Sequence, residues 1–324
     1  ADDIRGMGGQ VYVVFGGSGI GSTDLSTLNG TNGVVLQGQH RLTDSDDPDH
    51  PDFTFADSAG ASVAYAGDVN GDGRLDLFVT NWMAETCNLF LQGAGGVYED
   101  QAVRYGVAAD GLLMEGWGAQ FFDVDADGLV DLFVANGHLE ENDSKGGRMP
   151  PHLFRNRDGQ KLALVGSPTV GSYFKKQYLG RSVAVWDWNR DGRQDLVVSH
   201  TTDPVAMLTN RTVDAGHAIS LRLIGTQCER DSTGTLVTLS VGDRLLVREL
   251  VSGDGYAATN ERKLYFGLGP QSDNVNLDVS WPNGTSQRFA DLASDVEYVL
   301  IQGRTDAIPV RGSNPNPATV AQQP

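Results

Sequence analysis

The sequence predicts an all-β fold: a partial β-propeller of four-stranded blades with a smaller C-terminal β-domain. A nine-residue acidic pattern occurs three times, beginning at Asp68, Asp123 and Asp187, at intervals of roughly 60 residues that are typical of repeat arrays. Each copy lies between two strand-like stretches. Glycine is abundant, with 41 residues, which suits many short strands joined by turns.

Each repeat is expected to supply strands on both sides of its acidic pattern. A stretch with small residues precedes the pattern, an apolar strand follows it, and a third strand comes after a loop. The preceding stretches are 60–66, 116–122 and 180–186, the apolar strands begin at Leu77, Leu132 and Leu196, and the third strands cover 88–91, 152–155 and 205–208. A fourth short strand, as at 97–98, completes a four-stranded unit, and such units in series form propeller blades.

Residues 11–15, near the start of the chain, also predict a strand. The glycine-rich segment 16–21 that follows invites a dinucleotide-binding interpretation. A phosphate-binding loop must open a helix, however, and residues 22–33 are rich in turn-forming residues, so we reject that interpretation. The chain begins at Ala1 without a signal peptide, and we expect that further sequence precedes it.

The pattern changes near residue 213, where the acidic loops end. We predict propeller blades over 1–212, a second β-domain over 213–303 and a disordered tail over 304–324, which is rich in Pro, Asn, Thr and Gln. Within the second domain, strands are predicted at 218–224, 235–241, 244–251, 275–281 and 296–301.

The acidic pattern has the ligand spacing of a calcium loop. Positions 1, 3, 5 and 9 are Asp or Asn, Gly at position 6 permits a sharp turn, and position 7 offers a main-chain carbonyl. The predicted ligands are Asp68, Asn70, Asp72, Arg74 and Asp76 in the first loop, Asp123, Asp125, Asp127, Leu129 and Asp131 in the second, and Asp187, Asn189, Asp191, Arg193 and Asp195 in the third. Such hard oxygen ligands favour Ca²⁺ over zinc, and over magnesium with its near-ideal octahedral sites. We therefore expect about three structural Ca²⁺ sites.

The loops differ from EF-hands. Position 12 is Val79, Val134 or Val198 where an EF-hand has a bidentate Glu, and no helix flanks the loops. We expect calcium to neutralise a turn and hold two strands, without a helix-opening switch. The alternative is that these residues make only hydrogen-bonded turns, which three matching copies make less favourable. The second loop has four Asp and should bind most tightly.

Charge and composition exclude other classes. A net charge of −18 argues against nucleic-acid binding. No apolar run approaches the roughly 18 residues that cross a bilayer, so no membrane span is expected. The two cysteines, Cys87 and Cys228, are expected to be unpaired thiols. The histidines show no metal-ligand spacing, and interpreting the paired carboxylates as glycosidase acids is weak because calcium explains them.

The three loops with their flanking strands resemble FG-GAP/VCBS repeats, the calcium-binding blades of integrin-α-like β-propellers. Residues 8–16 and 28–33 look like the outer part of another such blade. The region 213–302 resembles the ASPIC/UnbV domain, through the segments 230–234, 252–256, 264–269 and 279–284. A propeller of this kind closes with about seven blades, so three complete repeats predict a partial propeller.

The resemblance implies a secreted or cell-surface protein, with a periplasmic location as a further option, that serves adhesion or ligand interaction without catalysis. Its partner would be a protein or glycan ligand at the cell surface or matrix. Two alternatives are a lectin-like propeller and a polysaccharide-active enzyme with unrecognised catalytic loops. Four tryptophans near the loops are expected to pack between blades, whereas a lectin would use Trp82 or Trp117 as a sugar platform; the four are Trp82, Trp117, Trp186 and Trp188.

Overall fold

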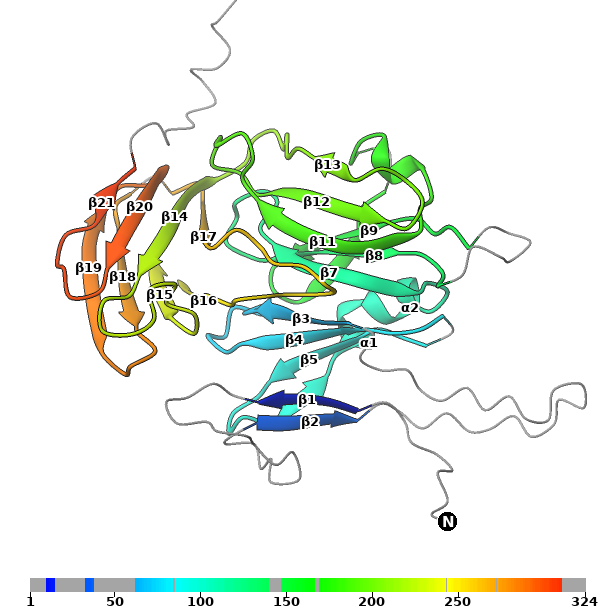
Figure 1. Cartoon of the computed structure of the whole chain (residues 1–324), viewed down its shortest axis with the longest axis horizontal. Coiled ribbons are helices and arrows are strands. Elements are labelled where there is room, and N and C mark those ends of the chain that lie inside the picture. Colours follow the sequence, from blue (N-terminus) through cyan, green and yellow to red (C-terminus); the bar gives the residue numbers. More distant parts are fainter. Residues whose placement is uncertain are drawn as a thin grey trace, which may run out of the picture.

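The regular structure of this chain is almost entirely β (Figure 1). The computed structural model describes residues 10–14, 33–37, 62–83, 85–139, 147–166, 169–242, 244–271 and 273–310. Within these residues the helices are short: α1 (Ala102–Tyr105), α2 (Val107–Gly111) and a 3₁₀ turn, Tyr173–Lys175. The predicted all-β class is therefore confirmed.

Three antiparallel sheets follow one another along the chain, and within each sheet every strand pairs with the next one in sequence. The first sheet contains β3 (Ser62–Gly67), β4 (Asp76–Thr80), β5 (Asn88–Gln92) and β6 (Tyr98–Asp100). The second contains β7 (Gly116–Phe122), β8 (Asp131–Asn136), β9 (His152–Arg157) and β10 (Lys161–Leu164). The third contains β11 (Gly180–Trp186), β12 (Asp195–His200) and β13 (Ala206–Leu208). These are propeller-type blades, and none of the described sheets closes on itself.

The small residues before each acidic loop allow neighbouring blades to approach closely. The first strand of the second blade, β7, contacts β3 on one side and β11 on the other. A Cβ on Gly118 would lie 2.5 Å from the carbonyl oxygen of Arg181 and 2.8 Å from the amide nitrogen of Val183. Larger residues fill the space further out, where Phe78 of the first blade and Phe154 of the second belong to one buried cluster.

At the N-terminal end of the described chain, β1 (Gln10–Val14) and β2 (Gly33–Gln37) form a separate antiparallel pair. The strand predicted at 11–15 corresponds to β1. The glycine-rich segment 16–21, and most of the stretch that resembles the outer part of another blade, lie outside the described residues.

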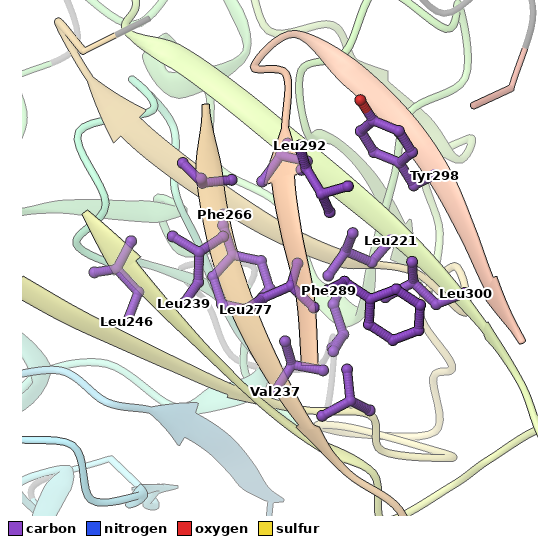
Figure 2. Packing of buried hydrophobic residues seen from close by; sticks show 14 of the residues in the cluster. Leu221, Val237, Leu239, Leu246, Phe266, Leu277, Phe289, Leu292, Tyr298 and Leu300 are labelled. Atoms are coloured by element: carbon purple, nitrogen blue, oxygen red, sulfur yellow. The ribbon is translucent and has the colours of Figure 1, made fainter. Parts of the chain in front are cut away.

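Two four-stranded sheets form the C-terminal part of the chain, with strand orders β17-β14-β20-β21 and β16-β15-β18-β19. Their strands are β14 (His217–Ile224), β15 (Leu236–Val241), β16 (Arg244–Glu249), β17 (Leu264–Gly269), β18 (Val275–Ser280), β19 (Ser286–Leu292), β20 (Val296–Ile301) and β21 (Ile308–Pro309). The sheets enclose one core, in which Leu221 and Leu300 of one sheet lie close to Leu277 and Phe289 of the other (Figure 2). Trp281, which follows β18, is 2 % exposed and belongs to this core.

Residues 304–310 correct the prediction of a disordered tail from Arg304 onwards. Strand β21 pairs with β20 through Val299 and Ile308, and Arg304 forms an ion pair with Asp306. A two-residue edge strand carries too little apolar periodicity to be recognised in a sequence. Residues 311–324 lie outside the described part of the chain.

The connection between β16 and β17, residues 250–263, is here called the axial loop because it runs along the first strands of all three blades (Figure 1). Asp254 Oδ1 accepts a hydrogen bond from the Tyr65 amide of β3 at 2.7 Å. Asn260 donates to Gln120 Oε1 of β7 at 2.7 Å and accepts from the Val185 amide of β11 at 2.8 Å. The inner edges of the blades are therefore occupied by a segment of the C-terminal domain.

Candidate metal sites

Each predicted calcium loop lies at the turn between the first and second strands of its blade: β3–β4, β7–β8 and β11–β12. The first Asp of each loop accepts backbone hydrogen bonds from positions 5 and 6. The donors lie 2.9 and 2.9 Å from the Asp68 oxygens, 3.1 and 2.8 Å from those of Asp123, and 3.0 and 3.0 Å from those of Asp187. The three loops therefore share one turn geometry.

Glycine at position 6 is required by this geometry. Gly73, Gly128 and Gly192 have φ angles of +81°, +95° and +79°, in the left-handed region that glycine adopts without a steric penalty. The predicted sharp turn is thus present in each loop.

The Asp at position 9 connects each loop to the third strand of its blade, or to the residues just after that strand. Asp76, Asp131 and Asp195 are 0 %, 2 % and 1 % exposed. In the second loop, Asp131 accepts from the amide of Val124 at 2.9 Å and from that of Asn156 in β9 at 2.7 Å. In the other two repeats, Asp76 accepts from the Gln92 amide and Asp195 accepts from the Asn210 amide. One carboxylate therefore bridges three segments of its blade.

Convergence of carboxylates is strongest in the second loop. Among the described residues, a group of three acidic side chains with ligand atoms within 4.8 Å of one another is formed by Asp123, Asp125 and Asp131. Asp125 is 7 % exposed, and neither of its oxygens accepts a hydrogen bond of normal geometry from a described residue. The Arg155 guanidinium contacts it as an ion-pair partner. A buried carboxylate of this kind, beside two others, fits a hard cation such as Ca²⁺.

The first and third loops have Asn at position 3, and this side chain is engaged within its own turn. Asn70 Oδ1 accepts from the Asp72 amide at 3.1 Å, and Asn70 Nδ2 donates to Asp72 Oδ2 at 2.8 Å. Asn189 and Asp191 make the same two contacts at 3.1 and 2.9 Å. The position 3 side chains of these two loops are therefore explained by a hydrogen-bonded turn alone. The position 3 side chain of the second loop, Asp125, is not.

Burial raises the pKa values of the loop carboxylates. Desolvation raises the pKa of Asp76 and of Asp123 to about 7 each, raises that of Asp195 to about 6, and raises that of Asp131 well above its usual range. The hydrogen bonds from backbone amides oppose these shifts. A bound cation would favour the charged form, because its opposite charge attracts the ionised carboxylates.

The C-terminal domain packs directly against the second loop. Arg244 Nη1 donates to the Asp127 carbonyl at 2.9 Å, and Arg248 Nη2 donates to the Gly128 carbonyl at 3.2 Å. Arg248 also lowers the pKa of Asp68 and Asp123 by its charge. Sequence reasoning missed both arginines and Arg155, because they come from strands far from the loops and carry no local signal.

Three of the four tryptophans near the loops fall into two groups. Trp117 is 8 % exposed: its Nε1 donates to the Gly137 carbonyl at 2.7 Å, Arg181 lies 4.5 Å above its ring, and Tyr256 of the axial loop makes an edge contact at 4.9 Å. Its predicted burial between blades is confirmed. The same prediction is wrong for Trp186 and Trp188, whose side chains are 43 % and 47 % exposed.

Asp254 gives the axial loop a pH-dependent contact. Burial raises the pKa of its carboxyl to about 7, although hydrogen bonds from the Tyr65 and Gly255 amides oppose the rise. Because an unfolded Asp titrates near about 3.9, the stabilisation from this group is complete below about pH 4 and is lost as the pH rises through about 7.

The free energy of unfolding of Asp254→Asn, relative to the wild type, should therefore rise by about 1 to 2 kcal/mol between pH 5 and pH 8. One pKa unit corresponds to about 1.36 kcal/mol, and solvent around this partly exposed side chain reduces the effect. Urea unfolding at several pH values measures this. Asp278→Asn, at a side chain 57 % exposed, is the control. An Asp254→Asn effect that does not vary with pH would contradict the prediction.

Three blade-type sheets with a repeated acidic turn between their first two strands define an all-β repeat protein with a separate two-sheet C-terminal domain. Residues 123–198 match the FG-GAP-like repeat, and residues 225–307 match the ASPIC and UnbV domain. The chain thus carries an FG-GAP-like repeat followed by an ASPIC/UnbV domain, as its resemblance implied. No curated protein matched the chain in a sequence search. Among the described residues, no helix is long and apolar enough to span a membrane.

Proposed function

We propose that this protein is a secreted or cell-surface repeat protein that serves adhesion or ligand interaction without catalysis, with a periplasmic location as the alternative. Bound Ca²⁺ would stabilise its blades. The observation that carries the calcium proposal is the group of Asp123, Asp125 and Asp131 in the second loop, with ligand atoms within 4.8 Å of one another. Three buried carboxylates this close repel one another when they are ionised, and the Arg155 guanidinium balances only one of the three charges.

The donor chemistry supports calcium. In the second loop the ion would be held by oxygen atoms of Asp123, Asp125, Asp127 and Asp131 and by the Leu129 carbonyl, which are the hard ligands that Ca²⁺ prefers. The equivalent positions would hold an ion in the first and third loops. Bound calcium would supply positive charge that balances the buried carboxylates of the turn.

The role would be structural, because the position 9 carboxylate joins the loop to the third strand side of the blade. Asp131 accepts from the Asn156 amide in β9 at 2.7 Å while it also faces Asp123 and Asp125. An ion in the second loop would therefore fix β7, β8 and β9 together. Its binding free energy would add to folding stability, as for any ligand of the folded state.

The lectin alternative is weakened at Trp117, where Arg181 and Tyr256 already contact the ring. The proposed ligand interaction therefore relies on other surfaces of the protein, and a protein or glycan at the cell surface or matrix is the proposed partner.

The calcium proposal is tested by isothermal titration of the metal-free protein with CaCl₂. We expect about three sites in the wild type. Asp125→Asn should weaken one site at least tenfold, because it removes a ligand charge without removing a hydrogen bond of the turn. Asp278→Asn, on the surface of the C-terminal domain, is the matched control and should bind like the wild type. A wild type that binds no calcium, or an Asp125→Asn variant with unchanged titration, would reject the proposal for the second loop.

A further inference from the structure

A cavity of about 590 Å³ lies between the third acidic loop and the C-terminal domain. One wall is formed by loop residues 190–193, and the opposite wall by the face of the β17-β14-β20 sheet that carries Ser220, Tyr265 and Glu297. Val124 and Ala126 of the second loop add apolar lining. The volume lies within the range of about 300 to 1,000 Å³ that is usual for small-molecule sites.

The carboxylates that line this cavity already have donors. Asp187 accepts from two loop amides, and Asp191 accepts from the Arg193 amide at 3.0 Å and from Asn189 Nδ2 at 2.9 Å. Asp295 holds His217 Nδ1 at 2.6 Å. Glu297 lies in a buried ion network, with Lys263 Nζ 3.1 Å from its Oε2 and Arg222 in contact with its Oε1. Each of these carboxylates therefore already has a hydrogen-bond or ion-pair partner within the protein.

Two cationic side chains in the cavity are not compensated in this way. Arg190 and Arg193 line the cavity, yet neither side chain donates a hydrogen bond or forms an ion pair with any residue that the structure describes. Arg193 lies near enough to Tyr265 to lower the pKa of its hydroxyl, against the larger effect of burial. Positive charge thus remains available for a ligand.

These arginines are particular to the third loop. Position 4 is Gly71 in the first loop and Ala126 in the second, and position 7 is Leu129 in the second loop. The first loop does have Arg74 at position 7, but its Nε donates to the Gln92 carbonyl at 2.6 Å and its guanidinium pairs with Asp72. The turn therefore does not need a free arginine, and Arg74 provides a matched control.

We propose that this cavity binds a small sugar that carries a carboxylate, of the size of one uronic acid, with the carboxylate held by Arg190 and Arg193. Guanidinium groups bind carboxylates through strong, charge-assisted hydrogen bonds. The polar groups of Ser220, Tyr265 and His217 suit sugar hydroxyls, and the apolar lining suits the carbon face of the ring. The site deepens the proposed ligand interaction and rests on it, but its binding groups are side chains that take no part in the predicted calcium coordination.

The test is a titration of the full chain in saturating CaCl₂. The ligands are sodium glucuronate, glucose and sodium sulfate, and binding is monitored by ligand-observed NMR. We expect saturable glucuronate binding, with glucose at least tenfold weaker because it lacks the charge. Arg193→Ala and Arg190→Ala should each weaken glucuronate binding at least tenfold, whereas Arg74→Ala should leave it unchanged. A uronate disaccharide serves as a second probe, and binding of the disaccharide without binding of glucuronate would overturn a site of the size of one uronic acid.

Calcium titration of the same variants separates this proposal from the proposed function. Arg190 is not among the predicted calcium ligands, so the calcium titration of Arg190→Ala should match the wild type. A protein that binds calcium but shows no saturable glucuronate binding at about 10 mM would overturn the cavity proposal alone. Equal affinity for glucose, equal affinity for sulfate, or the same loss in Arg74→Ala would also overturn it.

Discussion

Removal of calcium with EDTA is expected to lower the melting temperature of this protein by at least about 5 °C. A ligand present at a hundred times its dissociation constant stabilises the folded state by about 2.7 kcal/mol, and each kcal/mol shifts the melting temperature of a domain of 150–250 residues by about 2–4 °C. The proposed sites lie in three separate blades, so their contributions should add to a larger shift. Differential scanning calorimetry measures the effect.

The control for this experiment is EDTA that has been saturated with CaCl₂ beforehand, which should leave the melting curve unchanged. Re-addition of CaCl₂ should restore the original temperature, and the same concentration of MgCl₂ should restore less of it, because magnesium demands near-ideal octahedral geometry. An unchanged melt of protein from which calcium is shown to be absent would contradict a structural role for the ion.

Replacement of Gly118 by alanine should lower the free energy of unfolding by about 3 kcal/mol, the upper part of the usual range for overpacking. The new methyl group would lie 2.5 Å from the Arg181 carbonyl oxygen and 2.8 Å from the Val183 amide nitrogen. Both are backbone atoms of β11, so relief requires that β7 and β11 move apart. Urea unfolding followed by tryptophan fluorescence measures the loss.

Gly253→Ala is the matched control for this substitution. Its methyl group would meet its nearest neighbour, the Ala258 carbonyl oxygen, at 3.6 Å, which is an ordinary contact. We expect a change of less than about 0.5 kcal/mol, as for most surface substitutions. Equal effects of Gly118→Ala and Gly253→Ala would show that the close approach of the second and third blades does not depend on the missing side chain.

The blades could be predicted from the sequence because the information in each is local. The acidic loop, its left-handed glycine and the apolar strand after it occupy one short segment, and the hydrogen bonds of Asp68 to its own loop follow from that segment alone. In the C-terminal domain, β17 and β19 were not predicted as strands. Two of the six residues in β17 are glycine, and only Phe289 and Leu292 are buried in β19, so neither strand shows a clear apolar alternation.

The surroundings of the loops could not be predicted, because they depend on which distant strands meet. Arg248 reaches the second loop from a strand more than a hundred residues further along the chain, and the cavity beside Arg193 exists only where the third loop faces β14 and β20. Exposure of Trp186 has the same origin: its strand is apolar in sequence, but burial requires a partner surface that the local pattern does not specify.

The axial loop determines how the protein would respond to mechanical load. Asp254 and Asn260 join it to β3, β7 and β11 at the same time. A pulling force on the C-terminal domain would therefore be distributed over three sheets in parallel and would not strip the blades off one by one. Separation of the C-terminal domain from the blades would require these side-chain hydrogen bonds to three sheets to break together.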